Sequence, residues 1–134
     1  MSGAERFFDT NILLYLLSGD EAKADRAEKE LSSGGVLSVQ VLNEFAAVAV
    51  GKLNMPISEI REVLSAIRSV CNVVPLTDET HDLGLAIIER YALSIYDAMI
   101  VAAALLAGCK TLLSEDLRHG QTINGNLKIK NPFR

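Results

Sequence analysis

The sequence of 134 residues has few cysteines, no long apolar segment and no excess of basic charge. Its two cysteines, Cys71 and Cys109, do not form a CxxC pair, and isolated cysteines are typical of buried thiols in a reducing compartment. We therefore expect a cytoplasmic protein without a disulfide framework. The longest apolar stretch, residues 98–107, is too short to cross a bilayer and predicts a buried helix. Charges flank the apolar residues near the start, which does not match a secretory signal.

The net charge is −4, whereas a passive nucleic-acid-binding module is normally basic. An enzyme that acts on nucleic acid stays compatible with this charge, because metal ions can cancel the charge of its site while local basic residues hold phosphates. With 49% hydrophobic and 22% charged residues, the composition is that of a globular protein, and we find no internal repeat, low-complexity tract or linker. The sequence therefore predicts a single domain over residues 1–134, long enough to bury a core.

Short apolar segments alternate with segments of helical periodicity along the chain. We expect strands at Glu5–Phe8, Val36–Ser38, Asn72–Val74, Thr111–Leu113 and Leu127–Lys130, with a turn at Asn124-Gly125 before the last. We expect helices at residues 12–17, 20–31, 39–52, 59–69, 77–91 and 96–106. This alternation predicts an α/β fold with a central parallel sheet covered by helices on both faces. In such sheets ligands bind beyond the carboxyl ends of the strands, so acids directly after strands carry the most weight.

Two acidic residues follow predicted strands directly. Asp9 comes after residues 6–8, and Asp116 comes shortly after residues 111–113. Taken singly, Asp9 is interpreted as a helix N-cap and Asp116 as a solvated loop acid. These separate interpretations do not explain why two strands bring acids to the same edge of the sheet. We therefore predict that both acids serve a shared site.

Two further acids lie in helical segments among apolar residues. Glu44 shares a helix face with Val41 and Val48, where a carboxylate is costly to bury unless it is paired or binds a metal. A glutamate at the edge of the apolar stripe that reaches water is an equally good interpretation of this helix alone. Asp97 stands at the N-terminus of the apolar helix, where free N–H groups favour an anion, and capping by Ser94 is compatible with metal binding.

Four clustered carboxylates would repel one another, by about 4 kcal/mol for a pair at 4 Å and an effective dielectric of 20. A hard divalent cation with oxygen ligands removes this repulsion, and Mg²⁺ or Mn²⁺ suits a site without His or Cys. Such a cation can lower the pKa of a bound water and stabilise charge on a scissile phosphate. The acids therefore predict a divalent-cation site that is able to support hydrolysis of a phosphodiester.

Four segments, in order and spacing, resemble the PIN domain family, and within it the VapC type of toxin ribonuclease. The resemblance covers essentially the whole chain and is carried by Phe8-Asp9-Thr10-Asn11, by residues 38–45, by residues 94–104 and by residues 113–120. It implies a three-layer α/β/α fold and an endoribonuclease that depends on Mg²⁺ or Mn²⁺. The residues that it implies for metal ligation or water activation are Asp9, Glu44, Asp97 and Asp116, supported by Thr10, Asn11 and Ser114.

The resemblance also implies RNA as the substrate, a small antitoxin as the partner, and a homodimer. We expect the antitoxin to lay an apolar face along a groove and to deliver an Arg or Lys into the acidic pocket. Parts of the early helices are candidates to line this groove, because Ile12, Leu13, Leu16 and Leu17 are more apolar residues than one small helix needs for its core face. The alternative is that these residues are buried in a homodimer or in the core.

Other proteins with acidic pockets fit less well. A receiver domain would have paired acids after its first strand, where Thr10 and Asn11 stand, and a haloacid-dehalogenase-type phosphatase would have Asp at position 11. A flap-type DNA nuclease usually has a longer chain. Two alternatives stay open: a PIN-like nuclease that acts on DNA or structured RNA outside a toxin–antitoxin system, and a catalytically silent PIN-like binding protein. His119 and His81 are interpreted as non-catalytic, because the metal mechanism requires no histidine base.

Overall fold

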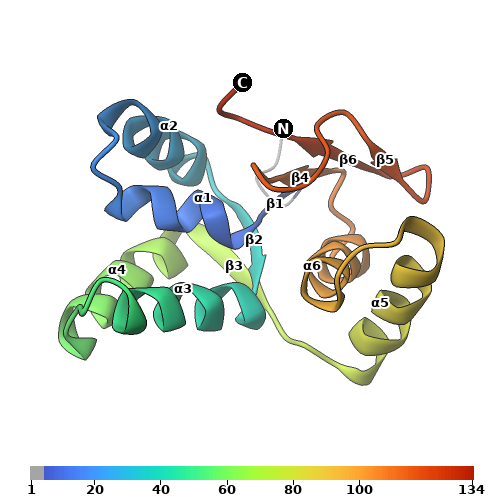
Figure 1. Ribbon diagram of the computed structural model, residues 1–134, viewed down its shortest axis with the longest axis horizontal. Coiled ribbons are helices and arrows are strands. Elements are labelled where there is room, and N and C mark those ends of the chain that lie inside the picture. The colour runs from blue at the N-terminus through green and yellow to red at the C-terminus, as the bar shows by residue number, and fades with distance from the viewer. Residues whose placement is uncertain (1–4) are drawn as a thin grey trace.

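A six-stranded sheet forms the centre of the computed structural model, which describes residues 5–134 (Figure 1). Its strands are β1 (Arg6–Phe8), β2 (Gly35–Ser38), β3 (Cys71–Val74), β4 (Thr111–Leu113), β5 (Thr122–Ile123) and β6 (Leu127–Lys130). Their order is β3-β2-β1-β4-β6-β5, and every neighbouring pair is parallel except β5 and β6. The expected central parallel sheet is confirmed. Residues 1–4, part of the segment assessed for a secretory signal, lie outside the described residues, and the single domain over residues 1–134 stays a prediction.

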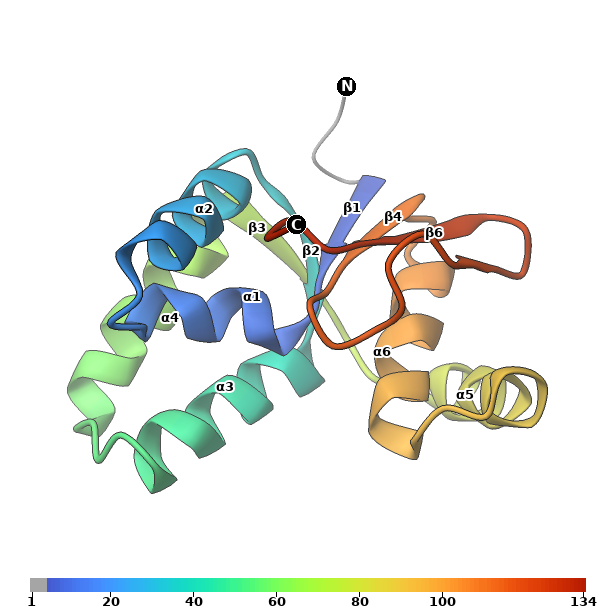
Figure 2. The same ribbon diagram turned by 45° about the horizontal axis from the view of Figure 1, so that its top comes forward.

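Helices cover both faces of this sheet. They are α1 (Thr10–Leu14), the 3-10 helix η2 (Tyr15–Leu17), α2 (Glu21–Ser32), α3 (Val39–Gly51), α4 (Ile57–Val70), α5 (Asp78–Tyr91) and α6 (Ile95–Leu106). The chain passes from β1 to β2 and β3 on one side of β1, and then returns to β4 on the other side of β1. Because crossovers between parallel strands are right-handed, the helices before β3 and the helices after β3 lie on opposite faces of the sheet. Figures 1 and 2 show α1 to α4 on one side of the sheet and α5 and α6 on the other. This is the expected three-layer α/β/α arrangement.

Buried strands and one very apolar helix supply the core. Phe7, Phe8, Leu37 and Leu112 are fully buried, as expected for parallel strands covered on both faces. A Cβ atom at Gly35 would lie 2.5 Å from the Phe8 ring, so a larger residue there would disturb the approach of β2 to β1. Within residues 5–134, no helix is long and apolar enough to span a membrane.

The structure departs from the expected elements in two places. The predicted helix over residues 12–17 is instead α1, which ends at Leu14, followed by the separate turn η2. Strand β5 was not expected, because two residues are too few to show a period of two. It forms only by hairpin pairing with β6 around Asn124 and Gly125, whose φ angles of 51° and 72° suit the predicted turn.

Both cysteines are buried thiols. Burial raises the pKa of Cys71 to about 11, although the charge of Arg6 opposes this, and burial raises the pKa of Cys109 to about 11 as well. Thiols with such pKa values are protonated at neutral pH and are poor nucleophiles.

Candidate active site

The carboxyl ends of β1 and β4 lie side by side at the switch point of the sheet. Phe8 pairs with Leu113, and the backbone N–H of Asp9 donates to the Leu113 carbonyl at 3.0 Å. From β1 the chain moves to β2 on one side, and it returns to β4 on the other side, so the loops after β1 and β4 diverge around a crevice. The two loops begin with Asp9 and Ser114.

Asp9 is a buried carboxylate held by short hydrogen bonds. Its Oδ1 accepts from the backbone N–H of Thr10 at 2.7 Å, and its Oδ2 accepts from the Ser114 hydroxyl at 2.8 Å. Asp9 is 5% exposed and Ser114 is 0% exposed. Asp9 is also the N-cap of α1, so the same carboxylate caps the helix and lies in the crevice. The Ser114 oxygen in turn accepts from the N–H groups of Asp116 and Leu117, both at 3.2 Å, which shapes the loop after β4.

Asn11 connects the two loops. Its Nδ2 donates to Asp116 Oδ2 at 3.0 Å and to Asp9 Oδ2 at 3.4 Å. Its Oδ1 accepts from the backbone N–H of Glu115 at 3.1 Å. The donor end of the amide therefore faces the acids, while the acceptor end faces the backbone of the loop. This arrangement places the exposed Asp116 beside the buried Asp9.

Glu44 joins the site from α3 through two hydrogen bonds. Its Oε1 accepts from the Thr10 hydroxyl at 2.5 Å, and its Oε2 accepts from Gln40 Nε2 at 3.0 Å. The same Gln40 nitrogen donates to the Tyr96 carbonyl at 3.0 Å, which ties the start of α6 to α3. Gln40 was not among the predicted site residues. Its position could have indicated a role, because it is a polar residue four positions before Glu44 on an apolar helix.

Asp97 lies half-buried in the first turn of α6, where its backbone N–H donates to the Ser94 hydroxyl at 3.2 Å. Burial raises the pKa of Asp97 most, the hydrogen bond from Ser94 lowers it, and the charges of Asp116 and Glu44 raise it further. These couplings place Asp97 within the electrostatic field of the other acids.

The pKa of Asp9 is raised from 3.8 to about 6. Burial is the largest cause, the hydrogen bonds from Ser114 and from the Thr10 N–H oppose it, and the charges of Asp97 and Asp116 raise it further. All four predicted acids therefore lie around one crevice: Thr10 links Asp9 to Glu44, Asn11 links Asp9 to Asp116, and Asp97 is close enough to Asp116 and Glu44 for their charges to raise its pKa. Their individual roles stay predictions.

None of the ion pairs formed within residues 5–134 involves these four acids. The pairs are Arg6–Glu30, Arg26–Glu30, Lys23–Glu115 and Lys110–Glu5. The donor set is all oxygen and carries unbalanced negative charge, which fits Mg²⁺ or Mn²⁺. In the described part of the chain, no three acidic, histidine or cysteine side chains form a ready-made metal cage. This does not conflict with magnesium, because Mg²⁺ is usually bound by one or two carboxylates and keeps several waters.

A cavity of about 410 Å³ adjoins the crevice. It is lined by Asn11, Leu14, Tyr15, Leu17, Ser18, Val48, Leu53, Glu115 and Asp116. Of the four candidates for the groove, only Leu17 lines this cavity. Ile12 and Leu13 are fully buried and Leu16 packs against the core, so for these three residues the alternative of burial in the core holds. Leu14 and Tyr15, which were not among the candidates, also line the cavity.

The fold and the acidic crevice define an α/β/α protein with four clustered carboxylates at the switch point of its sheet. The sequence matches the model of the PIN domain over residues 6–123, and the chain therefore belongs to the PIN domain family. No curated protein matches the sequence.

Several solved structures share the fold. One, described as a toxin-antitoxin complex from Klebsiella pneumoniae, has a TM-score of 0.71 and 24% identity, covering 95% of this chain and 97% of that chain. VapC20 of Mycobacterium tuberculosis, described as a Sarcin-Ricin loop cleaving toxin, has a TM-score of 0.64 and 19% identity, covering 80% and 86%. VapBC2 from Rickettsia felis, bound to a DNA fragment from its promoter, has a TM-score of 0.67 and 17% identity, covering 94% and 97%. At these identities, the likeness shows a shared fold.

Proposed function

We propose that this PIN-domain protein is a metal-dependent endoribonuclease that acts as the toxin of a VapBC-type toxin–antitoxin pair. The observation that carries the proposal is the set of Asp9, Glu44, Asp97 and Asp116, which share one crevice and make no ion pair within residues 5–134. Family membership supports a nuclease, and the similar structures include a toxin–antitoxin complex and a toxin that cleaves the Sarcin-Ricin loop.

In this proposal Asp9, Glu44, Asp97 and Asp116 would hold Mg²⁺ or Mn²⁺ and activate the attacking water. When bound, the cation supplies positive charge that lowers the pKa of water and offsets the charge of the scissile phosphate. Thr10 and Gln40 orient the Glu44 carboxylate, which stays half-exposed toward the crevice. Ser114 and Asn11 fix the oxygens of Asp9 and Asp116, so these acids need little reorganisation when substrate binds.

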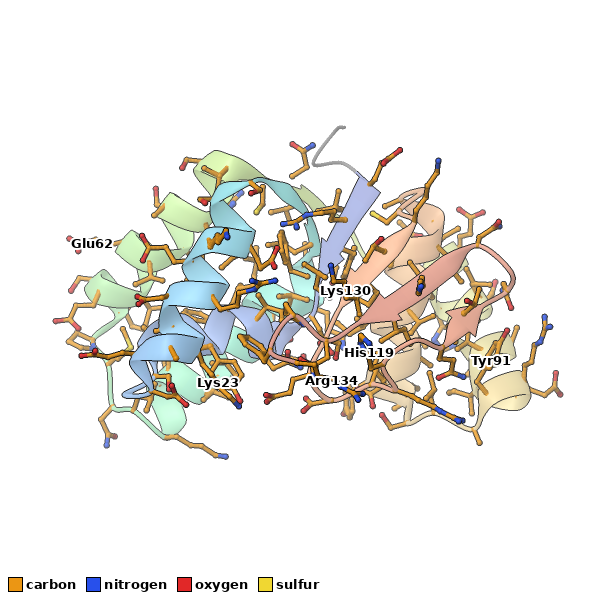
Figure 3. All side chains as sticks on the ribbon, turned by 90° about the horizontal axis from the view of Figure 1, so that it is seen from above. Lys23, Glu62, Tyr91, His119, Lys130 and Arg134 are labelled. Atoms are coloured by element: carbon orange, nitrogen blue, oxygen red, sulfur yellow. The ribbon has the colours of Figure 1, made fainter. Side chains whose placement is uncertain are left out.

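Basic residues beside the crevice can hold the RNA backbone. Lys130 pairs with Leu113 in the sheet, and its carbonyl accepts from the N–H of Ser114 at 3.0 Å, so it lies at the edge that carries the acids. Its side chain is exposed (Figure 3). His119 accepts from the N–H of Asn131 through Nδ1 at 3.0 Å, which links it to the C-terminal segment and supports the interpretation of His119 as non-catalytic.

The cavity next to Asp116 suits the proposed antitoxin. Its apolar wall, which includes Leu14, Leu17, Val48 and Leu53, can receive the apolar face of a partner segment. An Arg or Lys on that segment would meet Asp116 at the polar end of the cavity, where a guanidinium can form a bidentate pair with a carboxylate.

We further propose a cytoplasmic homodimer. Two buried thiols that form no disulfide support a reducing compartment. Three exposed apolar side chains at the starts of α3 and α6 offer a surface for a second copy: Val39, Ile95 and Tyr96. The molar mass in solution, measured by light scattering, tests the dimer.

The substrate class is tested by incubating the purified protein and Mg²⁺ with total RNA and, in parallel, with single-stranded and duplex DNA. We expect RNA fragments from the wild type and none from Asp97→Asn, whereas the exposed Asp82→Asn on α5 should cut like the wild type. Cleavage of DNA alone would favour a nuclease outside a toxin–antitoxin system. No cleavage of either polymer would favour a silent binding protein.

A further inference from the structure

Glu115 is an acid that lies beside the site but is not one of its four proposed functional acids. It lies between Ser114 and Asp116, and it lines the same cavity as Asp116 and Asn11. Its carboxylate is held by Tyr15 and Lys23: Oε2 accepts from Lys23 Nζ at 2.8 Å, and Oε1 accepts from the Tyr15 hydroxyl in a short hydrogen bond. Glu115 is therefore near the acids in the chain but is neutralised by a cation.

Lys23 is itself confined by several contacts. Its Nζ lies 3.0 Å from the Tyr15 hydroxyl, 4.7 Å from the centroid of the Tyr15 ring and 5.6 Å from the centroid of the Phe133 ring. The Tyr15 and Phe133 rings contact each other edge to face at 4.6 Å between centroids. The Lys23 side chain is 35% exposed and the Glu115 side chain 26% exposed, so neither end of the pair is fully solvated. Figure 3 shows Lys23 on α2, so the cluster joins η2, α2, the loop after β4 and the C-terminal segment.

The position of Glu115 makes its charge matter to the site. Its backbone N–H donates to Asn11 Oδ1, and the same Asn11 amide donates to Asp116. A Glu115 carboxylate without its cation would add a fifth negative charge next to four acids that make no ion pair within residues 5–134, and it lines the cavity that Asp116 also lines.

We propose that Lys23 is a positioning residue that holds the Glu115 carboxylate against Tyr15 and out of the acidic site, which leaves Asp116 to act alone at this edge. This inference rests on the proposed function. If it holds, removing the charge of Lys23 and removing the charge of Glu115 change the affinity for a divalent cation in opposite directions. A pair that only stabilised the fold would not give opposite changes.

The test is titration of Mn²⁺ into metal-free protein by calorimetry, with Lys23→Met, Glu115→Gln and the double variant. We expect Lys23→Met to bind Mn²⁺ more tightly and Glu115→Gln to bind it more weakly, each by about tenfold or less, because one unit charge changes near a divalent cation. The double variant should return to within about twofold of the wild type, since the uncompensated charge is then absent. Lys29→Met, which removes an exposed lysine from the same helix, is the matched control and should change nothing.

RNA cleavage at saturating Mg²⁺ gives a second readout. Lys23→Met should lower kcat with little change in KM, the double variant should recover kcat, and Lys23→Arg should keep both. Should Lys23→Met fail to fold, as judged by circular dichroism, weaker Mn²⁺ binding by Glu115→Gln decides the question. Unchanged Mn²⁺ affinity in Glu115→Gln, or a loss of affinity in both single variants that persists in the double, would overturn the positioning role. A wild type that neither binds Mn²⁺ nor cuts RNA would instead refute the proposed function on which it rests.

Discussion

Asp9→Asn should make the metal-free protein more stable at pH 8. The pKa of Asp9 rises from 3.8 to about 6 on folding, so the fold disfavours its ionised form. Each pKa unit corresponds to about 1.4 kcal/mol, so the rise corresponds to about 3 kcal/mol. Asn keeps the size of Asp and an oxygen for the Thr10 N–H, but its NH2 group replaces the oxygen that accepts from the Ser114 hydroxyl and the Asn11 amide, which offsets part of the gain. We therefore expect a gain of about 1–3 kcal/mol in the free energy of unfolding.

The dependence on pH gives the sign of this effect. Below about pH 4 Asp9 is protonated in both the folded and the unfolded state, and its burial as an acid carries no charge penalty. Between about pH 4 and 6 the unfolded state loses this proton while the folded state keeps it, so the contribution of Asp9 becomes destabilising as pH rises. Above about pH 6 the penalty is complete. The advantage of Asp9→Asn should accordingly be largest at pH 8 and vanish near pH 4.

The assay is urea denaturation with chelator present, at pH 8 and at pH 4, for the wild type, Asp9→Asn and the exposed control Asp82→Asn. For a domain of this size a gain of 1 kcal/mol raises Tm by about 3–5 °C, so thermal melts give the same answer independently. The control should follow the wild type at both pH values. An Asp9→Asn variant that is less stable than the wild type at pH 8, or equally shifted at both pH values, would refute the argument from burial of charge.

Four further outcomes are expected. Asp97→Asn should lower RNA cleavage by at least about a hundredfold, because it removes a charge at the reacting centre, and single-turnover rates beside Asp82→Asn check this. Mn²⁺ at a hundredfold excess over its Kd should stabilise the wild type by about 2.7 kcal/mol in thermal melts but Asp97→Asn much less. Gln40→Leu should lower the cleavage rate by about tenfold and the free energy of unfolding by about 1–2 kcal/mol, because Glu44 and the Tyr96 carbonyl lose their donor. A variant with wild-type kcat would contradict this. Lys130→Ala should raise KM with little change in kcat and reduce the salt slope of RNA binding by about 0.7–1, whereas an unchanged slope would remove Lys130 from the RNA surface.

The layer architecture and the neighbourhood of Asp9 and Asp116 could be predicted because each depends on local pattern. Short apolar strands between helices imply a parallel sheet, and parallel strands bring the residues after them to one edge. The acids after β1 and β4 do lie side by side, since these strands are neighbours in the sheet. The capping interpretation of Asp97 also agrees with its hydrogen bond to Ser94.

The rest of the site depends on contacts that no local pattern contains. Gln40 contacts Tyr96 across 56 positions, and Lys23 contacts Glu115 across 92 positions, so neither partner indicates the other in the sequence. The run at residues 12–17 left two interpretations open for a different reason. Every residue in it except Tyr15 is apolar, so the sequence does not show which side chains face the core and which face a cavity, and the structure buries Ile12 and Leu13 fully.

The central claim is that the acidic crevice cuts RNA only with a divalent cation. The measurement that tests it most directly is the single-turnover cleavage rate of a defined RNA by the wild type over a range of Mg²⁺ concentrations, with an excess of EDTA as the end point. We predict a rate that rises with Mg²⁺, saturates, falls to background in EDTA and returns when Mg²⁺ is restored. Cleavage that continues at full rate after exhaustive chelation would contradict the account.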